Sequence, residues 1–207
     1  RENRVTAQAG ASLRPICLEA IRAGLSGLEF AGGIPGSLGG AVAMMVQDSL
    51  YSDGTFRPLT EQERAAADLL AAAELDFSYR RSAVAEQEYI VLDAEFTLPE
   101  GDPQASMDKM NELNARRRDK QPLNYPSAGS TFKRPEGYFA AKLIDDCGLR
   151  GLTVGGAQVS EKHAGFIVNI GGATASDILE LMRQVEQRVF EQTGVQLEPE
   201  VRILGED

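Results

Sequence analysis

Apolar residues recur at the spacing of a helix in two long stretches of the chain. In the first, residues 105–121, Met107, Met110 and Leu113 fall on one side and Pro122 follows as a helix stop. We therefore predict an amphipathic helix over this range. The methionines are expected to pack in a core rather than to bind a ligand, because flexible apolar side chains suit irregular core packing.

The second stretch lies near the C-terminus and predicts a longer helix. Ser176 is expected to cap its start, and Gly194 suits its C-terminal end. The apolar positions that share one face are Ile178, Leu181, Met182, Val185 and Val189.

Capping signals predict two further helices nearer the N-terminus. Ser12 precedes Pro15 in a segment that runs toward Gly24, which is the arrangement of an N-cap followed by a first helical turn. Thr60 and Glu63 have the spacing of a capping box before an alanine-rich stretch, so a helix is expected there too.

Strand patterns alternate with these helices. Residues 89–98 are rich in strand formers and end before a proline, and apolar and polar residues alternate over 195–204. A shorter helix is predicted over 138–147 and a strand over 166–170. This mixture of elements predicts an α+β fold.

The pattern changes character at Pro122, where we expect a domain boundary. The predicted organisation is one lobe over residues 1–122 and a second over residues 123–207. A chain of 207 residues with 43% hydrophobic residues is large enough to form two small cores.

Charge and composition exclude several functional classes. The formal net charge of −10 argues against a general nucleic-acid-binding protein, which is normally basic. No apolar run is long enough to cross a bilayer, and no signal-peptide pattern follows Arg1. Cys17, Cys147 and His163 do not have the number or spacing of a usual zinc site. We expect a cytoplasmic protein with reduced thiols and with no metal, nucleic-acid or membrane partner.

A glycine-dense segment is the first candidate site. Five glycines fall within the nine residues 32–40, around Pro35. Backbone N–H groups that no side chain covers can approach an anionic ligand closely, so the segment is a candidate phosphate cradle. It lacks the spacing of a Walker loop and of the dinucleotide fingerprint. The alternative is a tight pair of turns.

A small hydroxyl side chain marks the second candidate site. Ser130 lies in Ser-Ala-Gly-Ser-Thr-Phe-Lys, residues 127–133. A lone loop serine is most often a cap or a turn former. The only histidine, His163, lies far downstream, so a hydrolase triad is disfavoured. A serine can instead act as a general acid if its conjugate base is short-lived. His163 is expected to have a structural or substrate-edge role rather than an acid–base role.

These two segments resemble the UDP-N-acetylenolpyruvoylglucosamine reductase family, as do Tyr-Arg-Arg-Ser, residues 79–82, and Leu-Glu-Pro-Glu-Val-Arg, residues 197–202. The resemblance implies three catalytic residues. Arg80 would act on the substrate carboxylate, which its planar, permanently charged fork suits. Ser130 would protonate the carbon next to that carboxylate, and Glu200 would stabilise or protonate the enolic intermediate.

Two neighbours compete for these roles. Glu198 shares the strand face of Glu200 and is the alternative carboxylate, and Arg81 is the alternative to Arg80. The substrate is further expected to contact Lys133, Arg118 and Tyr125.

The resemblance also implies the fold and the cofactors. The first lobe would be the C-terminal part of an FAD-binding lobe, and the second a small α+β substrate-binding domain. The expected reaction is FAD- and NADPH-dependent reduction of UDP-N-acetylglucosamine enolpyruvate to UDP-N-acetylmuramate in peptidoglycan synthesis, by a monomer. The residues expected to hold FAD are Gly33, Ile34, Pro35, Gly36, Ser37, Gly39, Gly40 and Ala41.

Some parts of the sequence differ from the family pattern. Family members carry an earlier lobe with a Gly-Gly-Gly-Ser-Asn type loop, and they usually read Met-Asn-Ala-Gly-Ala where this chain continues from Met44 into Met-Val-Gln-Asp. Arg134 stands where many members have Asn. We expect the natural protein to be longer, or the sequence to be gapped near Met44. The alternatives are a non-catalytic sugar-nucleotide-binding fragment without a working flavin site, and a flavin oxidase of related fold.

Overall fold

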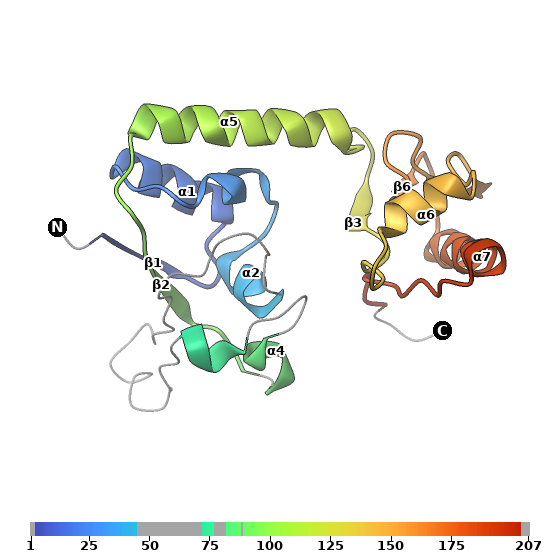
Figure 1. Cartoon of the computed structure of the whole chain (residues 1–207), viewed down its shortest axis with the longest axis horizontal. Coiled ribbons are helices and arrows are strands. Elements are labelled where there is room, and N and C mark those ends of the chain that lie inside the picture. Colours follow the sequence, from blue (N-terminus) through green and yellow to red (C-terminus); the bar gives the residue numbers. More distant parts are fainter. Residues whose placement is uncertain (1–2, 45–71, 77–81, 88, 204–207) are drawn as a thin grey trace. The chain divides into compact units, whose positions relative to one another are not determined.

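Figure 1 shows the computed structural model of the chain, which describes residues 3–44, 72–76, 82–87 and 89–203. The chain divides into two compact units, Arg1–Arg117 and Arg118–Asp207. The division falls near the end of helix α5 (Pro103–Lys120), and the predicted boundary at Pro122 lies just beyond that helix. The role of each part in binding a cofactor or a substrate stays a prediction.

The first unit contains a two-stranded sheet surrounded by helices. Strand β1 (Arg4–Gln8) pairs antiparallel with β2 (Asp93–Thr97) over their full lengths. Besides most of α5, the described residues of this unit form α1 (Leu13–Arg22), the 3₁₀ helix η1 (Glu29–Gly33), α2 (Leu38–Met44), the 3₁₀ helix η2 (Ala72–Leu75) and α4 (Ala83–Glu86).

The core of this unit is built from α1, α2, η2, α4 and β2, and α5, which runs beside α1 in Figure 1, adds Met110 to it. Met110 is 2% exposed, and its sulfur accepts a contact of 3.6 Å from the Cys17 thiol. Burial raises the pKa of Cys17 to about 11, with the nearby Glu29 charge acting in the same direction. Cys17 is therefore a protonated thiol at neutral pH, and the predicted role of the methionine stripe in core packing is confirmed at Met110.

The predicted starts and stops of these helices are largely confirmed. Ser12 occupies the N-cap of α1 with an extended backbone, although its hydroxyl makes no capping hydrogen bond. Helix α5 starts at Pro103, two residues before the predicted start, and Asp102 caps it by accepting a hydrogen bond of 2.7 Å from the Ala105 N–H. The capping box predicted at Thr60 lies outside the described residues.

The second unit is a four-stranded antiparallel sheet covered by helices. Its strand order is β3-β6-β5-β4. Helix α7 packs against β4 and β5 and also contacts α6. The elements are β3 (Ser127–Ser130), α6 (Ala140–Asp146), β4 (Thr153–Val154), β5 (Ala157–Val159), β6 (Phe166–Asn169) and α7 (Ala175–Thr193).

The long C-terminal helix α7 is confirmed, and its predicted cap is wrong. The buried residues of its apolar face are Leu181, Met182, Val185 and Val189. Gly194 follows in the left-handed conformation, as expected of a C-cap. The N-cap is Thr174 and not Ser176: the Thr174 hydroxyl accepts from the Asp177 N–H at 3.1 Å, and the Asp177 carboxylate accepts from the Thr174 N–H at 2.9 Å. Ser176 lies inside the first turn, where its own hydroxyl has no role as a cap.

The strand predicted over 195–204 is also wrong within the described residues. The segment after Gly194 makes one isolated antiparallel bridge, between Phe132 and Pro199. Pro199 has no N–H, so it cannot donate to a continuous ladder, and the bridge is closed by hydrogen bonds of its two neighbours, Glu198 and Glu200. Leu197 is still 1% exposed and joins the core, so the apolar alternation predicts burial correctly there.

Two other predicted elements are shorter than expected. The strand over 89–98 is limited to Asp93–Thr97, because only these residues pair with β1. The helix over 138–147 is limited to Ala140–Asp146, and the residues before it form a turn in which the Tyr138 N–H donates to the Pro135 carbonyl.

In the part of the chain that the structure describes, no helix has both the length and the apolar character needed to span a membrane.

The capping assignment of α7 gives a direct test. Thr174→Ala removes one half of the reciprocal cap and should lower the free energy of unfolding by about 1 kcal/mol. Ser176→Ala is the matched control: it removes an exposed hydroxyl from the same helical turn and should cost nothing measurable. Urea unfolding of both variants measures the difference. A larger loss for Ser176→Ala than for Thr174→Ala would contradict the assignment.

Candidate active site

Ser130 lies at the end of β3, where the strand contains a bulge. Ser127 pairs with Val168 and Ser130 pairs with Phe166, so the register shifts between the two serines. Gly129, the residue before Ser130, has a φ of 89°, a conformation that favours glycine. A bulge of this kind re-aims the side chains around it. Ser130 is exposed, so a bound ligand can reach its hydroxyl.

Thr131 fixes the position of the segment that follows. Its N–H donates to the Gly165 carbonyl at 2.9 Å, and its hydroxyl accepts from the Ile167 N–H at 3.1 Å. On its other side its carbonyl accepts from the Glu200 N–H at 2.8 Å. Thr131 is 4% exposed, so these hydrogen bonds are shielded from water. Breaking one of them would leave a buried polar group without a partner, which is unfavourable.

The next two residues extend this contact to the C-terminal segment. Phe132 is buried and forms the bridge with Pro199. The Lys133 N–H donates to the Glu198 carbonyl at 2.8 Å, and the Lys133 ammonium forms an ion pair with the Glu198 carboxylate. The structure therefore brings the segment 130–133 and the segment 198–200 together, although they are far apart in the sequence.

This contact places two of the predicted catalytic residues near one another. Glu200 is directly opposite Thr131, which is the neighbour of Ser130 in the chain. Glu200 is half-buried, whereas Ser130 and Glu198 are exposed. The third predicted catalytic residue, Arg80, lies outside the described residues.

The other predicted substrate contacts are spread over the second unit. Tyr125 is 45% exposed in the turn before β3, where its N–H donates to the Pro122 carbonyl. Arg118 is exposed, and its carbonyl accepts a hydrogen bond of 2.6 Å from the Lys162 ammonium. The roles of Tyr125 and Arg118 toward a substrate stay predictions. Arg134, which follows Lys133 and is not one of the predicted contacts, lies over the Phe139 ring at 4.0 Å.

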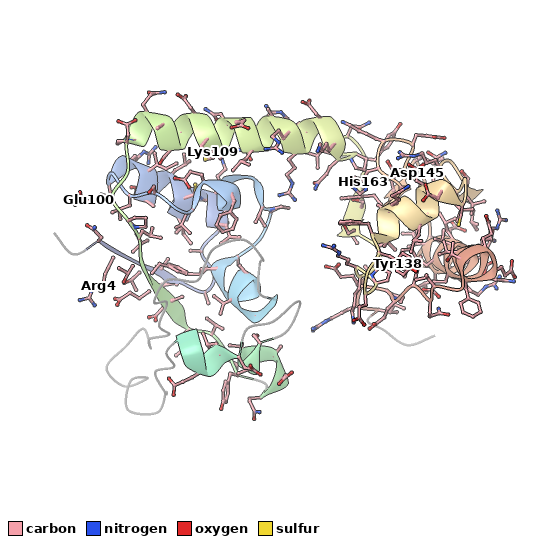
Figure 2. The ribbon with its side chains drawn as sticks, viewed as in Figure 1. Arg4, Glu100, Lys109, Tyr138, Asp145 and His163 are labelled. Atoms are coloured by element: carbon pink, nitrogen blue, oxygen red, sulfur yellow. The ribbon has the colours of Figure 1, made fainter. Side chains whose placement is uncertain are left out.

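His163 is held in its neutral form by its surroundings. Figure 2 shows its place in the second unit. Its Nδ1 accepts a hydrogen bond of 3.2 Å from the Gly165 N–H, and its ring meets the Phe166 ring edge-on at 5.0 Å. Burial lowers the pKa of His163, and the charge of Arg150 acts in the same direction. These contacts favour a structural role for the imidazole.

The glycine-dense segment of the first unit runs from η1 into helix α2. The first N–H groups of α2 donate within the protein: Leu38 to the Ala11 carbonyl at 2.9 Å, Gly39 to the Ala9 carbonyl at 2.8 Å, and Gly40 to the Ser37 hydroxyl at 3.3 Å. A Cβ atom on Gly39 would lie 2.9 Å from the Ala9 Cβ. Gly39 is therefore needed for close backbone packing, and these three donors are not aimed at an open space.

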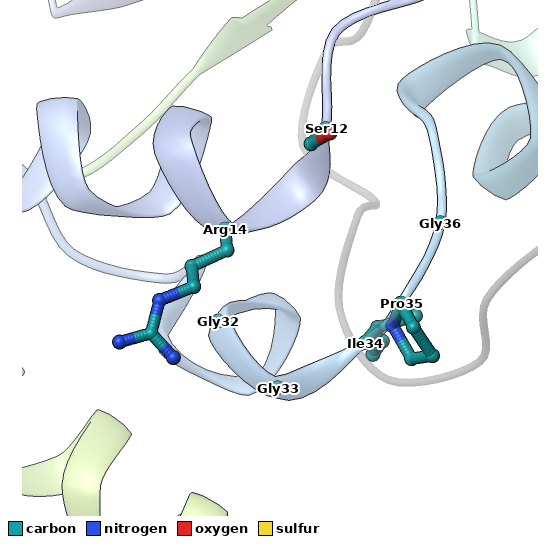
Figure 3. Close-up of a pocket in the computed structure, with 7 residues that line it drawn as sticks. All are labelled: Ser12, Arg14, Gly32, Gly33, Ile34, Pro35 and Gly36. Atoms are coloured by element: carbon teal, nitrogen blue, oxygen red, sulfur yellow. The ribbon is translucent and has the colours of Figure 1, made fainter.

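The first half of the same segment lines a cavity, which Figure 3 shows in close-up. The cavity has a volume of about 460 Å³, within the range of small-molecule sites. Its lining residues are Ser12, Arg14, Gly32, Gly33, Ile34, Pro35 and Gly36. Four of the eight residues predicted to hold FAD belong to this lining, whereas Ser37, Gly39, Gly40 and Ala41 do not.

Two arginines near this cavity were missed by the sequence patterns. Arg14 contributes an exposed cation to the lining from the first turn of α1. Arg117 is half-buried and donates a hydrogen bond of 2.7 Å to the Gly33 carbonyl, and burial lowers its pKa. Its signal in the sequence is its position seven residues after Met110, which places both on one face of α5.

Among the described residues, no group of three or more His, Cys, Asp or Glu side chains could hold a metal ion.

Comparison with known proteins identifies the family. A sequence model of the C-terminal domain of UDP-N-acetylenolpyruvoylglucosamine reductase matches residues 121–204. The UDP-N-acetylenolpyruvoylglucosamine reductase of Clostridium botulinum (strain Hall) is 51% identical over 209 residues, which cover 99% of this chain and 68% of the relative. The chain belongs to the UDP-N-acetylenolpyruvoylglucosamine reductase family. The reductase of Pediococcus pentosaceus is also 51% identical, over 99% of this chain and 69% of its own length.

A solved structure of the reductase family confirms the predicted fold class. The crystal structure of the UDP-N-acetylenolpyruvylglucosamine reductase from Thermus caldophilus matches with a TM-score of 0.74 and 36% identity. The match covers 95% of this chain and 71% of that chain. The α+β architecture expected from the alternation of helices and strands is thus the architecture of a reductase of this family.

The packing of the glycine-dense segment predicts an unequal effect of two substitutions. Gly39→Ala should lower the free energy of unfolding by about 1–3 kcal/mol, because the new methyl group meets the Ala9 Cβ and lies 3.3 Å from the Ala9 carbonyl oxygen. Gly36→Ala is the control, since its Cβ would lie 3.9 Å from the nearest atom, the Ile34 Cγ2. Thermal or denaturant unfolding compares the two. Equal stabilities would show that Gly39 does not pack as described.

The buried imidazole predicts a pH dependence of stability. His163 has a lowered pKa in the folded state, so its stabilising contribution is complete above its ordinary pKa of 6.5 and is lost as the pH falls through the lowered value. His163→Asn keeps a side-chain acceptor for the Gly165 N–H but does not titrate. The free energy of unfolding of the wild type, minus that of the variant, should therefore decrease from about pH 8 to about pH 5. Parallel curves over this range would be the contrary result.

Proposed function

We propose that the protein is an FAD- and NADPH-dependent oxidoreductase that reduces UDP-N-acetylglucosamine enolpyruvate to UDP-N-acetylmuramate in peptidoglycan synthesis. Membership of the reductase family supports the substrate class. The observation that carries the proposal is the backbone pairing of residues 131–133 with Glu198, Pro199 and Glu200. It supports the proposal because Ser130 directly precedes the paired segment, to which Lys133, Glu198 and Glu200 belong.

Ser130 is the proton donor of the proposed reaction. Reduction of the enol ether adds a hydride to the terminal vinyl carbon and a proton to the neighbouring carbon, which carries the carboxylate. The Ser130 hydroxyl is exposed and follows the bulge at Gly129. Because Thr131 is fixed by buried hydrogen bonds, the hydroxyl is presented from a rigid backbone, which favours proton transfer to a fixed atom.

Arg80 stabilises the negative charge that develops on the substrate, and Glu200, as a carboxylic acid, stabilises or protonates the enolic intermediate. Arginine suits the carboxylate of the enolpyruvyl group because two of its N–H groups can bind both oxygens. The backbone of the half-buried Glu200 is hydrogen-bonded to Thr131, next to Ser130, which supports a role for its carboxyl group in the same step. Lys133, with Arg118 and Tyr125, binds the anionic and polar parts of the sugar nucleotide.

The cavity in the first unit fits part of the proposed flavin. Gly33, Ile34, Pro35 and Gly36 form a wall without long side chains, and Arg14 supplies a positive charge for a phosphate group. Arg117 holds the Gly33 carbonyl and so fixes the backbone of this wall. Bound FAD, once reduced by NADPH, supplies the hydride. The chain's own contribution is to orient the flavin and to keep this wall rigid.

The proton-donor role is tested by Ser130→Ala in the FAD-loaded protein. NADPH should still bleach the flavin absorbance, because that step does not use Ser130. Reoxidation of the reduced flavin by the enolpyruvyl sugar nucleotide should slow by about 100-fold or more. Stopped-flow absorbance measures both steps separately. Ser176→Ala, an exposed serine on α7, is the control and should react as the wild type does.

The outcomes separate this proposal from its alternatives. Reoxidation at the wild-type rate in Ser130→Ala would remove the proton-donor assignment. A wild-type protein that binds the sugar nucleotide in calorimetry, but neither binds FAD nor turns over, would be a non-catalytic binding protein. Reoxidation by other substrates and not by the enolpyruvyl sugar would indicate a flavin oxidase.

A further inference from the structure

Lys133 is attached to Glu198 at two points. Its backbone N–H donates to the Glu198 carbonyl at 2.8 Å, and its ammonium pairs with the Glu198 carboxylate. The backbone link fixes where the two residues lie. The side-chain link then determines where the ammonium at the end of a long, flexible stem is found.

This ion pair adds very little to the stability of the fold. The Lys133 side chain is 39% exposed and that of Glu198 is 69% exposed, and ion pairs at such exposed sites are largely screened by water and salt. The segment is already held by the buried Thr131 and by the bridge between Phe132 and Pro199. The Glu198 carboxylate therefore has no structural task that these contacts do not already perform.

A free lysine side chain samples many rotamers, and ordering it upon binding reduces affinity. A partner that restrains the ammonium before the ligand arrives removes part of this loss. We propose that Glu198 is a positioning residue, whose carboxylate holds the Lys133 ammonium on the segment that carries Ser130, ready to bind an anionic group of the sugar nucleotide. This inference rests on the proposed function and gives Glu198 a task distinct from that of Glu200.

Two effects of removing the Glu198 charge oppose each other. The loss of a restraint on Lys133 weakens substrate binding, whereas the loss of a negative charge near the site strengthens the attraction of an anion. Screening by water and salt weakens an interaction more when the charges lie further apart, so the direct contact between Lys133 and Glu198 is expected to outweigh the repulsion of a more distant anion. The sign of the change in KM thus decides between positioning and simple repulsion.

The test is a double-mutant cycle in the FAD-loaded protein. Glu198→Gln should raise the KM for the enolpyruvyl sugar nucleotide about 2- to 5-fold and leave kcat within about two-fold of the wild type. The same substitution in a Lys133→Met background should have no further effect on KM, because Glu198 acts through Lys133. Calorimetry with the oxidised protein, without NADPH, should give the same pattern in Kd. Glu198→Asp retains a carboxylate and should recover part of the wild-type affinity.

Matched controls make the result specific. Glu180→Gln removes another exposed ion pair of the second unit, that with Arg183, and should change neither KM nor Kd. Thermal unfolding of each variant, measured in parallel, should show the small effect expected of an exposed pair.

Each contrary outcome has its own meaning. An equal rise of KM in both backgrounds, or an unchanged or lower KM in Glu198→Gln, would overturn the positioning role. A large fall in kcat with slow flavin reoxidation would overturn it too, because Glu198 would then be catalytic itself. If the wild-type protein binds and reduces the sugar nucleotide while the coupling is absent, only this inference fails. If the wild type neither binds nor reduces the sugar nucleotide, the proposed function is wrong, and this inference is wrong with it.

Discussion

The candidate active site depends on the hydrogen bonds of one buried residue, Thr131. Through its N–H, hydroxyl and carbonyl it joins β3 to the residues around β6 on one side and to Glu200 on the other. The segment after Gly194 has few other backbone partners among the described residues, since Pro199 prevents a continuous ladder, and the bond from Glu200 to Thr131 is one of the two that flank the Phe132–Pro199 bridge. The position of Glu200 relative to Ser130 is thus set by backbone hydrogen bonds that are shielded from water. Such bonds are costly to break, so they preserve the geometry that proton transfer requires.

The glycine-dense segment of the first unit differs from the open phosphate cradle that its sequence suggests. A cluster of glycines predicts an open cradle of N–H groups, but the donors of Leu38, Gly39 and Gly40 are used inside the protein. The part that is open lies earlier, where residues 32–36 line the cavity with Arg14 beside them. Both halves of the motif are closely packed, since a Cβ on Gly32 would lie 2.5 Å from the Met110 sulfur, but only the first half lines the cavity. Half of the residues predicted to hold a flavin therefore lie away from the cavity.

The sequence predicts the helices well because helical periodicity and capping are local. Helices α1, α5 and α7 lie within about two residues of their predicted bounds. The choice of Thr174 over Ser176 could not be predicted, because either hydroxyl suits an N-cap and only the reciprocal bond with Asp177 decides. In the second unit the strand predicted over 166–170 is confirmed as β6, whereas β3, β4 and β5 escaped prediction because strands of two to four residues are too short to show an alternation. Ser130 could be selected from its motif, whereas the contacts that hold its segment, such as Thr131 with Ile167, 36 positions away, could not, because they join distant parts of the chain.

The second unit separates its rigid frame from the groups that do the proposed chemistry. Thr131 and Phe132 are each 4% exposed, whereas the Lys133 and Glu198 side chains are 39% and 69% exposed. Side chains on the exposed side can vary without disturbing the buried frame, because exposed contacts contribute little to stability. Arg134 illustrates this freedom. Its guanidinium lies over the exposed Phe139 ring and donates to the Tyr138 carbonyl, so a residue that departs from the common family motif is accommodated at the surface. Residues on this side of the unit can therefore differ from the family motif while the buried frame beneath stays the same.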